Sequence, residues 1–187
     1  LSLILTEEVE GVKQGGLLTL PLEFDSGIMR GRFHTDGQLY VAGMTSWQSA
    51  GRQAGSFHRV RYAGGPHHLP VSLNTASNGL RLGFSQPLDP EEATRLSNYH
   101  IEQWNYRWTR SYGSSRYSVK EPTRAGTDTV EVASATLSSN RKSVFLEIPE
   151  IQPVMGMSID YTLPAADGSA MDQVIYNTIN RVPTGGE

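Results

Sequence analysis

An aromatic and arginine-rich segment, residues 103–117, is the part of the sequence best suited to binding chemistry. It reads Gln-Trp-Asn-Tyr-Arg-Trp-Thr-Arg-Ser-Tyr-Gly-Ser-Ser-Arg-Tyr. Sugar recognition needs flat aromatic faces that stack on C–H-rich pyranose surfaces, together with fixed donors and acceptors for the hydroxyl groups. This composition supplies both, so we expect a polysaccharide as the partner. The predicted ligand-binding residues are Trp104, Tyr106, Trp108, Arg110, Tyr112, Arg116 and Tyr117.

The aromatic side chains of this segment have two interpretations. Along an extended strand, Trp104, Tyr106 and Trp108 share one face, which would form a platform. The same face could instead pack between two sheets, as a tryptophan in the third strand of an immunoglobulin-type sandwich does, and for Trp104 we favour that core position. For Trp108, Tyr112 and Tyr117, surface binding and packing within a loop stay open.

The same region is locally basic in a chain whose net charge is −3. A basic patch of this kind suits an anionic glycan, either carboxylated or sulfated, because arginine offers bidentate contacts to such groups. The simpler alternative, which we slightly favour, is that the arginines stack on the tyrosines of the loop or pair with nearby acids. The cations are Arg107, Arg110, Arg116, Lys120 and Arg124, against the single acid Glu121.

Catalytic and cofactor chemistry finds little support in the sequence. The chain has no cysteine, which excludes disulfides, thiolate zinc sites, covalent c-type haem and cysteine nucleophiles within it. No nucleophile elbow, phosphate loop or calcium loop is present. We therefore expect no enzyme activity, no cofactor and no metal. A metal-dependent oxidase is a minor alternative, since histidines could meet through space: His34, His58, His67, His68 and His100.

The composition also limits the classes of partner that we expect. At 187 residues the chain can bury a substantial core. With a net charge of −3 it lacks the basic field that duplex-binding proteins use, so nucleic acid is not an expected partner. No apolar run approaches the length needed to cross a bilayer, so a membrane is not expected either.

The hydrophobic pattern predicts an all-β fold, because short apolar runs bounded by turn residues recur along the whole chain. One short helix is predicted over 90–97, with Asp89 as N-cap and Pro90 at the first helical position. The expected strands are Leu1–Thr6, Leu17–Phe24, Gln38–Met44, Phe57–Tyr62, Pro70–Thr75, Leu80–Ser85, Tyr99–Tyr106, Thr129–Leu137, Ser143–Ile148, Ser158–Leu163 and Val174–Ile179.

A domain boundary is predicted in the stretch Gly-Gly-Pro-His-His-Leu-Pro at 64–70, where two glycines and two prolines interrupt strand pairing. We expect a β-rich segment over 1–65 and a sandwich over 66–187. Within the sandwich, residues 108–128 lack strand periodicity and should form a long loop, and long loops in compact domains are more often functional than idle.

Two motifs carry a family resemblance. Phe84-Ser-Gln-Pro-Leu-Asp89, followed by a short helix and Asn98-Tyr99, resembles the opening of bacterial Ig-like domains, and Met157-Ser-Ile-Asp-Tyr-Thr-Leu resembles a closing strand of the same family. This resemblance covers about 71–171. It implies an Ig-like antiparallel β-sandwich with additional N-terminal strands.

The residues from Ser26 to Met44, with Asp36-Gly37 as a hairpin turn, resemble a blade of the β-propeller in sorbosone/glucose-dehydrogenase-like quinoproteins. The whole chain is similar to the C-terminal portion of large secreted proteins that join such a propeller and a c-type cytochrome to an Ig-like end. The resemblance implies an extracellular or periplasmic accessory module with the other domains of a parent protein as partners. One blade and no cysteine cannot hold those cofactors, so catalysis does not carry over. A purely structural role, docking on and positioning the propeller and cytochrome, is the alternative to polysaccharide binding.

Overall fold

The computed structural model describes residues 1–45 and 51–185 as two compact units built almost entirely of β-strands. One unit comprises Ser2–Leu18 with the residues from His67 onward, and the other comprises Leu1 with Thr19–Pro66. The strands are β1 (Ser2–Val9), β2 (Val12–Thr19), β3 (Ile28–Phe33), β4 (Leu39–Met44), β5 (Gly55–Val60), β6 (Pro70–Ala76), β7 (Gly79–Phe84), β8 (Tyr99–Trp104), β9 (Asp128–Thr129), β10 (Ser134–Leu137), β11 (Ser143–Glu147), β12 (Val154–Pro164) and β13 (Ala170–Ile179).

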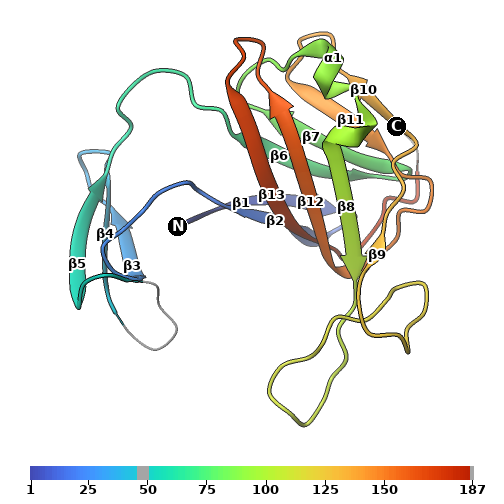
Figure 1. The fold of residues 1–187 in the computed structure, drawn as a ribbon, viewed down its shortest axis with the longest axis horizontal. Coiled ribbons are helices and arrows are strands. Elements are labelled where there is room, and N and C mark those ends of the chain that lie inside the picture. The colour runs from blue at the N-terminus through green and yellow to red at the C-terminus, as the bar shows by residue number, and fades with distance from the viewer. Residues whose placement is uncertain (46–50, 186–187) are drawn as a thin grey trace. The chain divides into compact units, whose positions relative to one another are not determined.

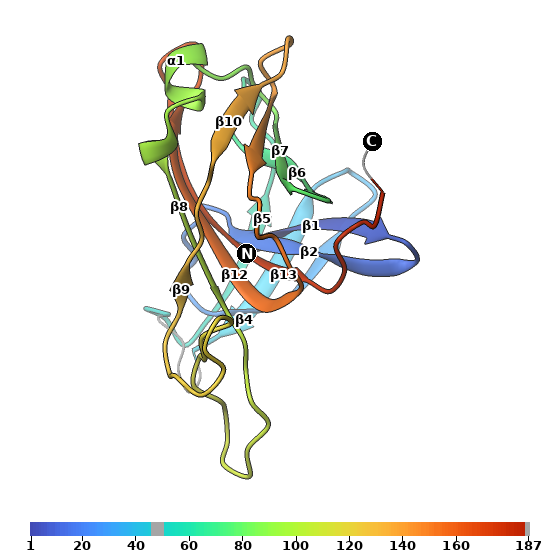
Figure 2. The same cartoon turned by 90° about the vertical axis from the view of Figure 1, so that its right-hand side faces the viewer.

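The larger unit is an antiparallel β-sandwich, which confirms the expected all-β sandwich fold. One sheet has the order β1-β2-β13-β12-β8-β9 and the other has the order β10-β11-β7-β6. Figure 2 shows the two sheets as separate layers, with β8, β12 and β13 in one and β6, β7 and β10 in the other.

The core lies between these two sheets because alternate residues of each strand point inward. In β7, Leu80, Leu82 and Phe84 are buried, as their spacing predicts. The opposite sheet contributes Ile159 and Tyr161, and the rings of Phe84 and Tyr161 meet edge to face with their centroids 5.6 Å apart. Burial of each such side chain stabilises the fold by about 1.5–3 kcal/mol.

The β1–β2 hairpin belongs to this sandwich, which differs from the predicted division at residue 65. Its tight turn uses the left-handed conformations of Glu10 and Gly11, whose φ angles are 47° and 80°. The second strand then pairs with β13 over Gly15↔Thr178 to Leu17↔Tyr176. A single unit over 1–65 is therefore not what the chain forms, because the hairpin needs β13 as its sheet neighbour.

The smaller unit contains a three-stranded antiparallel sheet of order β3-β4-β5. The predicted turn at Asp36-Gly37 joins β3 to β4, and Gly37 has a φ of 78°. The strand predicted over Leu17–Phe24 is wrong, because β2 ends at Thr19 and the next strand, β3, starts at Ile28. Gly64 and Gly65, both at positive φ, lead from this unit toward β6.

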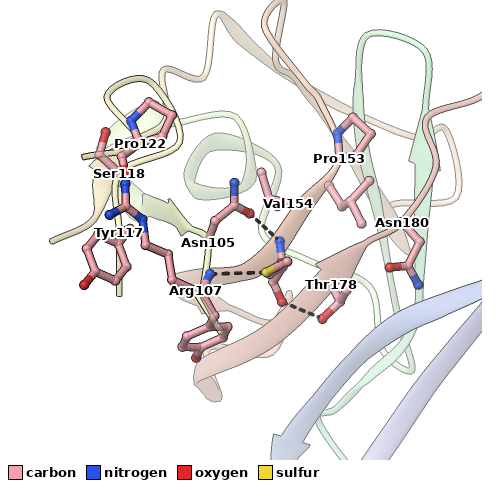
Figure 3. Close-up of a pocket in the computed structure, with 12 residues that line it drawn as sticks. Asn105, Arg107, Tyr117, Ser118, Pro122, Pro153, Val154, Thr178 and Asn180 are labelled. Atoms are coloured by element: carbon pink, nitrogen blue, oxygen red, sulfur yellow. Dashed lines mark hydrogen bonds between the residues drawn. The ribbon is translucent and has the colours of Figure 1, made fainter. Parts of the chain in front are cut away.

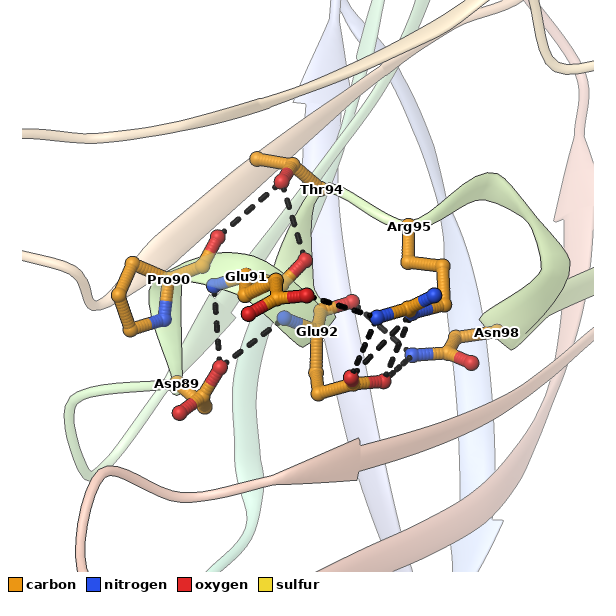
Figure 4. A network of polar contacts seen from close by, with 7 residues as sticks. All are labelled: Asp89, Pro90, Glu91, Glu92, Thr94, Arg95 and Asn98. Atoms are coloured by element: carbon orange, nitrogen blue, oxygen red, sulfur yellow. Dashed lines mark hydrogen bonds and ion pairs between the residues drawn. The ribbon is translucent and has the colours of Figure 1, made fainter.

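The predicted helix is present as a single turn, α1 (Pro90–Ala93), followed by the 3₁₀ turn η1 (Leu96–Asn98). The carboxylate of Asp89 accepts hydrogen bonds from the backbone amides of Glu91 and Glu92, both at 3.0 Å, which confirms it as the N-cap (Figure 4). Arg95 then bonds the side chains of Glu91 and Glu92, so the turn is held by its own ion pairs. No helix among the described residues is both long and apolar enough to cross a membrane.

The predicted strand Thr129–Leu137 is two strands in different sheets. Residues of β9 pair with β8 over Gln103↔Asp128 and Glu102↔Thr129, whereas β10 pairs with β11. The intervening residues 130–133 carry the chain from one sheet to the other. Between β8 and β9 lies the long loop of residues 105–127, which Figure 1 shows extending beyond the end of the sheet.

Candidate functional site

The long loop starts where the strand periodicity ends. Strand β8 stops at Trp104, and the next residue, Asn105, forms a β-bridge with Tyr117 through reciprocal backbone hydrogen bonds of 2.8 and 2.9 Å. Tyr117 also forms a bridge with Ala125. The loop is thereby pinched at Tyr117 into a tip, residues 106–116, and a base, residues 118–127.

Hydrogen bonds to the carboxylate of Asp128 anchor the base of the loop. The buried Asp128 accepts hydrogen bonds from the Ser118 hydroxyl at 2.7 Å and from the backbone amides of Val119 and Lys120 at 2.6 and 3.0 Å, and it also pairs with Arg124. Burial alone would raise the pKa of the Asp128 carboxyl, but these hydrogen bonds and the Arg124 charge lower it. No pattern in the sequence indicates this anchor, because Ser118 and Asp128 lie ten positions apart in an irregular segment.

Two open grooves meet beside the pinch. The loop groove, of about 550 Å³, is lined mainly by Tyr106, Arg107, Tyr117, Pro122 and the ends of β12 and β13 (Figure 3). The sheet groove, of about 580 Å³, runs over β1, β2, β12 and β13. Both lie in the size range of small-ligand sites. They share Tyr106, Met155 and Thr178, so these three residues form the ridge between them.

The ridge is fixed by hydrogen bonds at its base. The Asn105 side-chain oxygen accepts from the Met155 amide at 2.9 Å, and the Met155 carbonyl accepts from the Thr178 hydroxyl at 3.0 Å (Figure 3). The Tyr106 amide lies 3.2 Å from the Met155 sulfur. Loop, β12 and β13 are therefore tied together where the two grooves meet.

Trp104 is buried, with 3 % of its surface exposed, but it does not lie in the sandwich core. Its neighbours Ile101 and Gln103 point inward against Ile159 and Met157, so alternation places Trp104 on the outer face of the sheet. There its indole packs over Gly156, and the Arg116 guanidinium carbon lies 3.9 Å from its ring centroid. Trp104 is therefore buried, as the favoured interpretation expected, but it lies on the outer face of the sheet and not between the two sheets, and its ring face is not open to a sugar.

The predicted platform of Trp104, Tyr106 and Trp108 does not form as one strand face, since β8 ends at the first of them. Tyr106 is 42 % exposed and lies on the ridge, whereas Trp108 is 90 % exposed at the tip of the loop. Arg110 and Tyr112 are also exposed at the tip and line neither groove. The third tryptophan of the chain, Trp47, lies outside the described residues.

The cations of the loop divide into paired and unpaired groups. Lys120 pairs with Glu150 at 3.3 Å, and Arg124 pairs with Glu121 and Asp128. Arg107 and Arg116 stack on aromatic rings instead, those of Tyr117 at 4.3 Å and Trp104 at 3.9 Å. Within residues 1–45 and 51–185, none of Arg107, Arg110 and Arg116 forms an ion pair with a carboxylate.

Part of the site comes from residues that sequence reasoning did not single out. Lys13, Leu17, Tyr176 and Thr178 line the sheet groove from β2 and β13. Leu17 and Tyr176 are a cross-strand pair, 42 % and 48 % exposed, on the same outer face as Trp104. Their alternation with buried neighbours marks them as outward, but only the pairing of the hairpin with β13 brings them beside the loop.

The histidines are dispersed over the described part of the chain. Four of them each face one carboxylate, and no group of three or more metal-ligating side chains gathers there. The pairs are His34–Asp36 at 3.5 Å, His58–Asp25 at 3.6 Å, His68–Asp167 at 3.3 Å and His100–Glu102 at 4.0 Å.

Comparison with known proteins adds no assignment to this geometry. No protein-family model, curated protein or solved structure matches the chain.

Proposed function

We propose that the chain is a non-catalytic module of a larger secreted protein and that it binds polysaccharide where the loop groove and the sheet groove meet. The observation that carries the proposal is the position of Tyr106. Its half-exposed ring stands on the ridge shared by both grooves, with Arg107 beside it in the sequence and Arg116 lining the sheet groove with it.

The chemistry of this ridge suits a sugar chain rather than a compact ligand. An open groove on each side of Tyr106 allows an extended polymer to pass over the ridge while one pyranose ring stacks on the aromatic face. The exposed rings of Trp108 and Tyr112 at the loop tip offer further faces for sugar units beyond the grooves.

Affinity gel electrophoresis on a broad panel of soluble polysaccharides, followed by titration calorimetry, tests this proposal. We expect retardation on at least one polysaccharide and a roughly two- to tenfold weaker affinity for Tyr106→Ala, because one aromatic contact is lost. Tyr62→Ala, an exposed tyrosine of the other unit, is the matched control and should bind normally. Absence of retardation on every polysaccharide would overturn the proposal.

The proposed location is extracellular or periplasmic. Support comes from the resemblance to secreted quinoprotein and cytochrome proteins, and the lack of cysteine is compatible with it. Fractionation of cells that express the native full-length protein tests the location, and recovery of the protein in the cytoplasm would contradict it.

A second function, docking on the other domains of a parent protein, is favoured by the three-stranded unit. Its sheet carries large exposed apolar side chains, with Phe33 at 74 %, Phe57 at 70 % and Met29 at 53 % exposure. Phe33 pairs with Leu39 and Phe57 pairs with Ala42, so the two rings lie on opposite faces of the sheet, where each could be buried by a docked domain. If the chain is only a docking domain, tryptophan fluorescence should be insensitive to every sugar, and Phe33→Ser should weaken binding to the propeller or cytochrome domain.

A further inference from the structure

We propose that the site is specific for acidic polysaccharides, whose carboxylate or sulfate groups are bound by Arg107 and Arg116 in the orientation set by their aromatic supports. This inference rests on the proposed function and narrows its ligand class. Neutral sugar chains should bind weakly or not at all.

Arg116 is the first of the two anion-binding groups. Its guanidinium carbon lies 3.9 Å from the ring centroid of Trp104, which itself packs against Gly156. A guanidinium that rests on an aromatic ring still has its N–H groups free in its own plane, where they form the bidentate contacts that carboxylate and sulfate oxygens accept. Because Trp104 is buried, its role is to support the arginine.

Arg107 repeats the same arrangement in the loop groove. Its guanidinium carbon lies 4.3 Å from the ring centroid of Tyr117, and one of its N–H groups donates to the Pro122 carbonyl (Figure 3). Tyr117 is fixed in turn by its backbone bridge to Asn105. Two arginines are thus held in defined orientations, one in each groove, with Tyr106 on the ridge between the grooves.

The charge around these arginines favours an anion. Neither groove has a carboxylate among the described residues of its lining, and the sheet groove adds Lys13. The acids near the loop are already engaged, Glu150 by Lys120 and Asp128 by Arg124. A guanidinium without a carboxylate partner, on a chain whose net charge is −3, is a local cationic site that an acidic ligand can fill.

A sugar polymer is favoured over a nucleic acid as the source of the anion. Single-stranded nucleic acids are bound by aromatic faces on which bases stack, in grooves that track the backbone with a strong positive field. Here the Trp104 ring is covered, and the chain is acidic overall. The distinct arginine positions suit charges carried on separate sugar units.

The test compares polymers that differ in charge and share a backbone: polygalacturonate against its fully methyl-esterified form, and dextran sulfate against dextran. We expect the charged member of at least one pair to bind the wild-type chain at least about tenfold more tightly, and rising salt to weaken that binding. The pair that shows the difference identifies carboxylate or sulfate as the ligand group.

Four variants locate the effect. Arg116→Gln and Arg107→Gln should each weaken binding of the charged polymer about tenfold, whereas Arg110→Gln, in the same loop but outside both grooves, should weaken it clearly less. Arg116→Lys retains the positive charge but lacks the planar guanidinium group that makes bidentate contacts, so its affinity for the charged polymer should also fall several-fold. Circular dichroism shows whether each variant is folded. If Arg116→Gln does not fold, the binding measured for Arg116→Lys tests the role of Arg116 in its place.

Each contrary outcome has a distinct meaning. Equal affinity for both members of both pairs would overturn the acidic specificity and leave polysaccharide binding standing. No binding to any polymer would overturn both proposals. Equal losses in Arg110→Gln and Arg116→Gln, or tighter binding of oligo(dT) than of any charged polysaccharide, would overturn the assignment of Arg107 and Arg116 as sugar-acid ligands.

Discussion

The Arg116 guanidinium lies over the Trp104 indole, with 3.9 Å between the guanidinium carbon and the ring centroid. This relationship changes the function that the tryptophan can have. A buried ring on the outer face of a sheet, with an arginine stacked on it, acts as a rigid base for a cation. In the sheet groove, the groups beside Trp104 that can meet a ligand directly are Arg116 and the half-exposed Tyr106.

Gly156→Ala should disrupt this base. A methyl group at Gly156 would lie 2.4 Å from the Trp104 Cε2 and Nε1 atoms, so the indole must move. We expect a loss of roughly 1–3 kcal/mol in the free energy of unfolding, measured by urea denaturation, together with weaker binding of acidic polysaccharide. Gly185→Ala, whose methyl group would meet no atom within 4 Å, is the control. An unchanged free energy of unfolding for Gly156→Ala would contradict the packing described.

Gln14→Leu should loosen the N-terminal hairpin. The buried Gln14 side chain accepts from the amides of Asn180 at 2.9 Å and Arg181 at 2.8 Å, and it donates to Glu7 at 2.7 Å. Leucine leaves those amides without an acceptor, at roughly 1–3 kcal/mol for each unmet group. Urea denaturation should therefore show a loss of at least about 2 kcal/mol.

The control for that variant is Gln152→Leu, a half-buried glutamine whose side chain has no hydrogen bond among the described residues. It should leave the free energy of unfolding within about 0.5 kcal/mol of the wild-type value. Equal losses in Gln14→Leu and Gln152→Leu would show that the hairpin is not held by Gln14.

Asp128→Asn should remove part of the acid sensitivity of the fold. The pKa of Asp128 is lowered from its ordinary 3.8 in the folded state, so its stabilising effect is complete above that value and is lost as the pH falls through the lower, folded pKa. Urea denaturation at pH 7, 5 and 3 should show the wild type to be more stable than Asp128→Asn at pH 7 and 5, with a smaller difference at pH 3. A difference that stays constant over this range would refute the linkage.

Excision of residues 20–66 should leave the sandwich folded. That stretch forms a unit of its own between β2 and β6, and none of its described residues forms a strand of either sandwich sheet. With a flexible Gly-Ser linker of about 15 residues in its place, we expect one cooperative unfolding transition and a blue-shifted contribution of the buried Trp104 to the fluorescence, beside that of the exposed Trp108. Loss of the cooperative transition would mean that the sandwich depends on the excised unit.

The sequence predicted the sandwich well where alternation and turn chemistry were local. Leu80, Leu82 and Phe84 point inward as their spacing requires, and Asp89 with Pro90 starts the helix. The sequence predicted a strand from Leu17 to Phe24, whereas β2 starts at Val12 and runs through the Gly15-Gly16 pair. A side chain at Gly15 would collide with the Leu5 carbonyl, so the glycine permits close strand contact there.

The candidate site was predicted only in part, because it depends on contacts that span the chain. The residues 104–117 could be chosen from composition, and the stacking of arginines on aromatic rings was one of the expected alternatives. The side of the sheet that Trp104 occupies follows from its register with Gly156, which no local pattern reveals. The contribution of Lys13 likewise depends on the pairing of β2 with β13.

The pairing of β2 with β13 also determines when the protein can assemble on the ribosome. Gln14 and Asn180 are 166 positions apart, yet they bond side chain to main chain across this junction. The hairpin is translated before β13 and has no sheet neighbour until β13 is available, so its apolar residues Leu5 and Leu18 cannot be buried in the sandwich before then. Such long-range closure makes folding slow, and it makes the pairing of β2 with β13 a late step in the assembly of the sandwich.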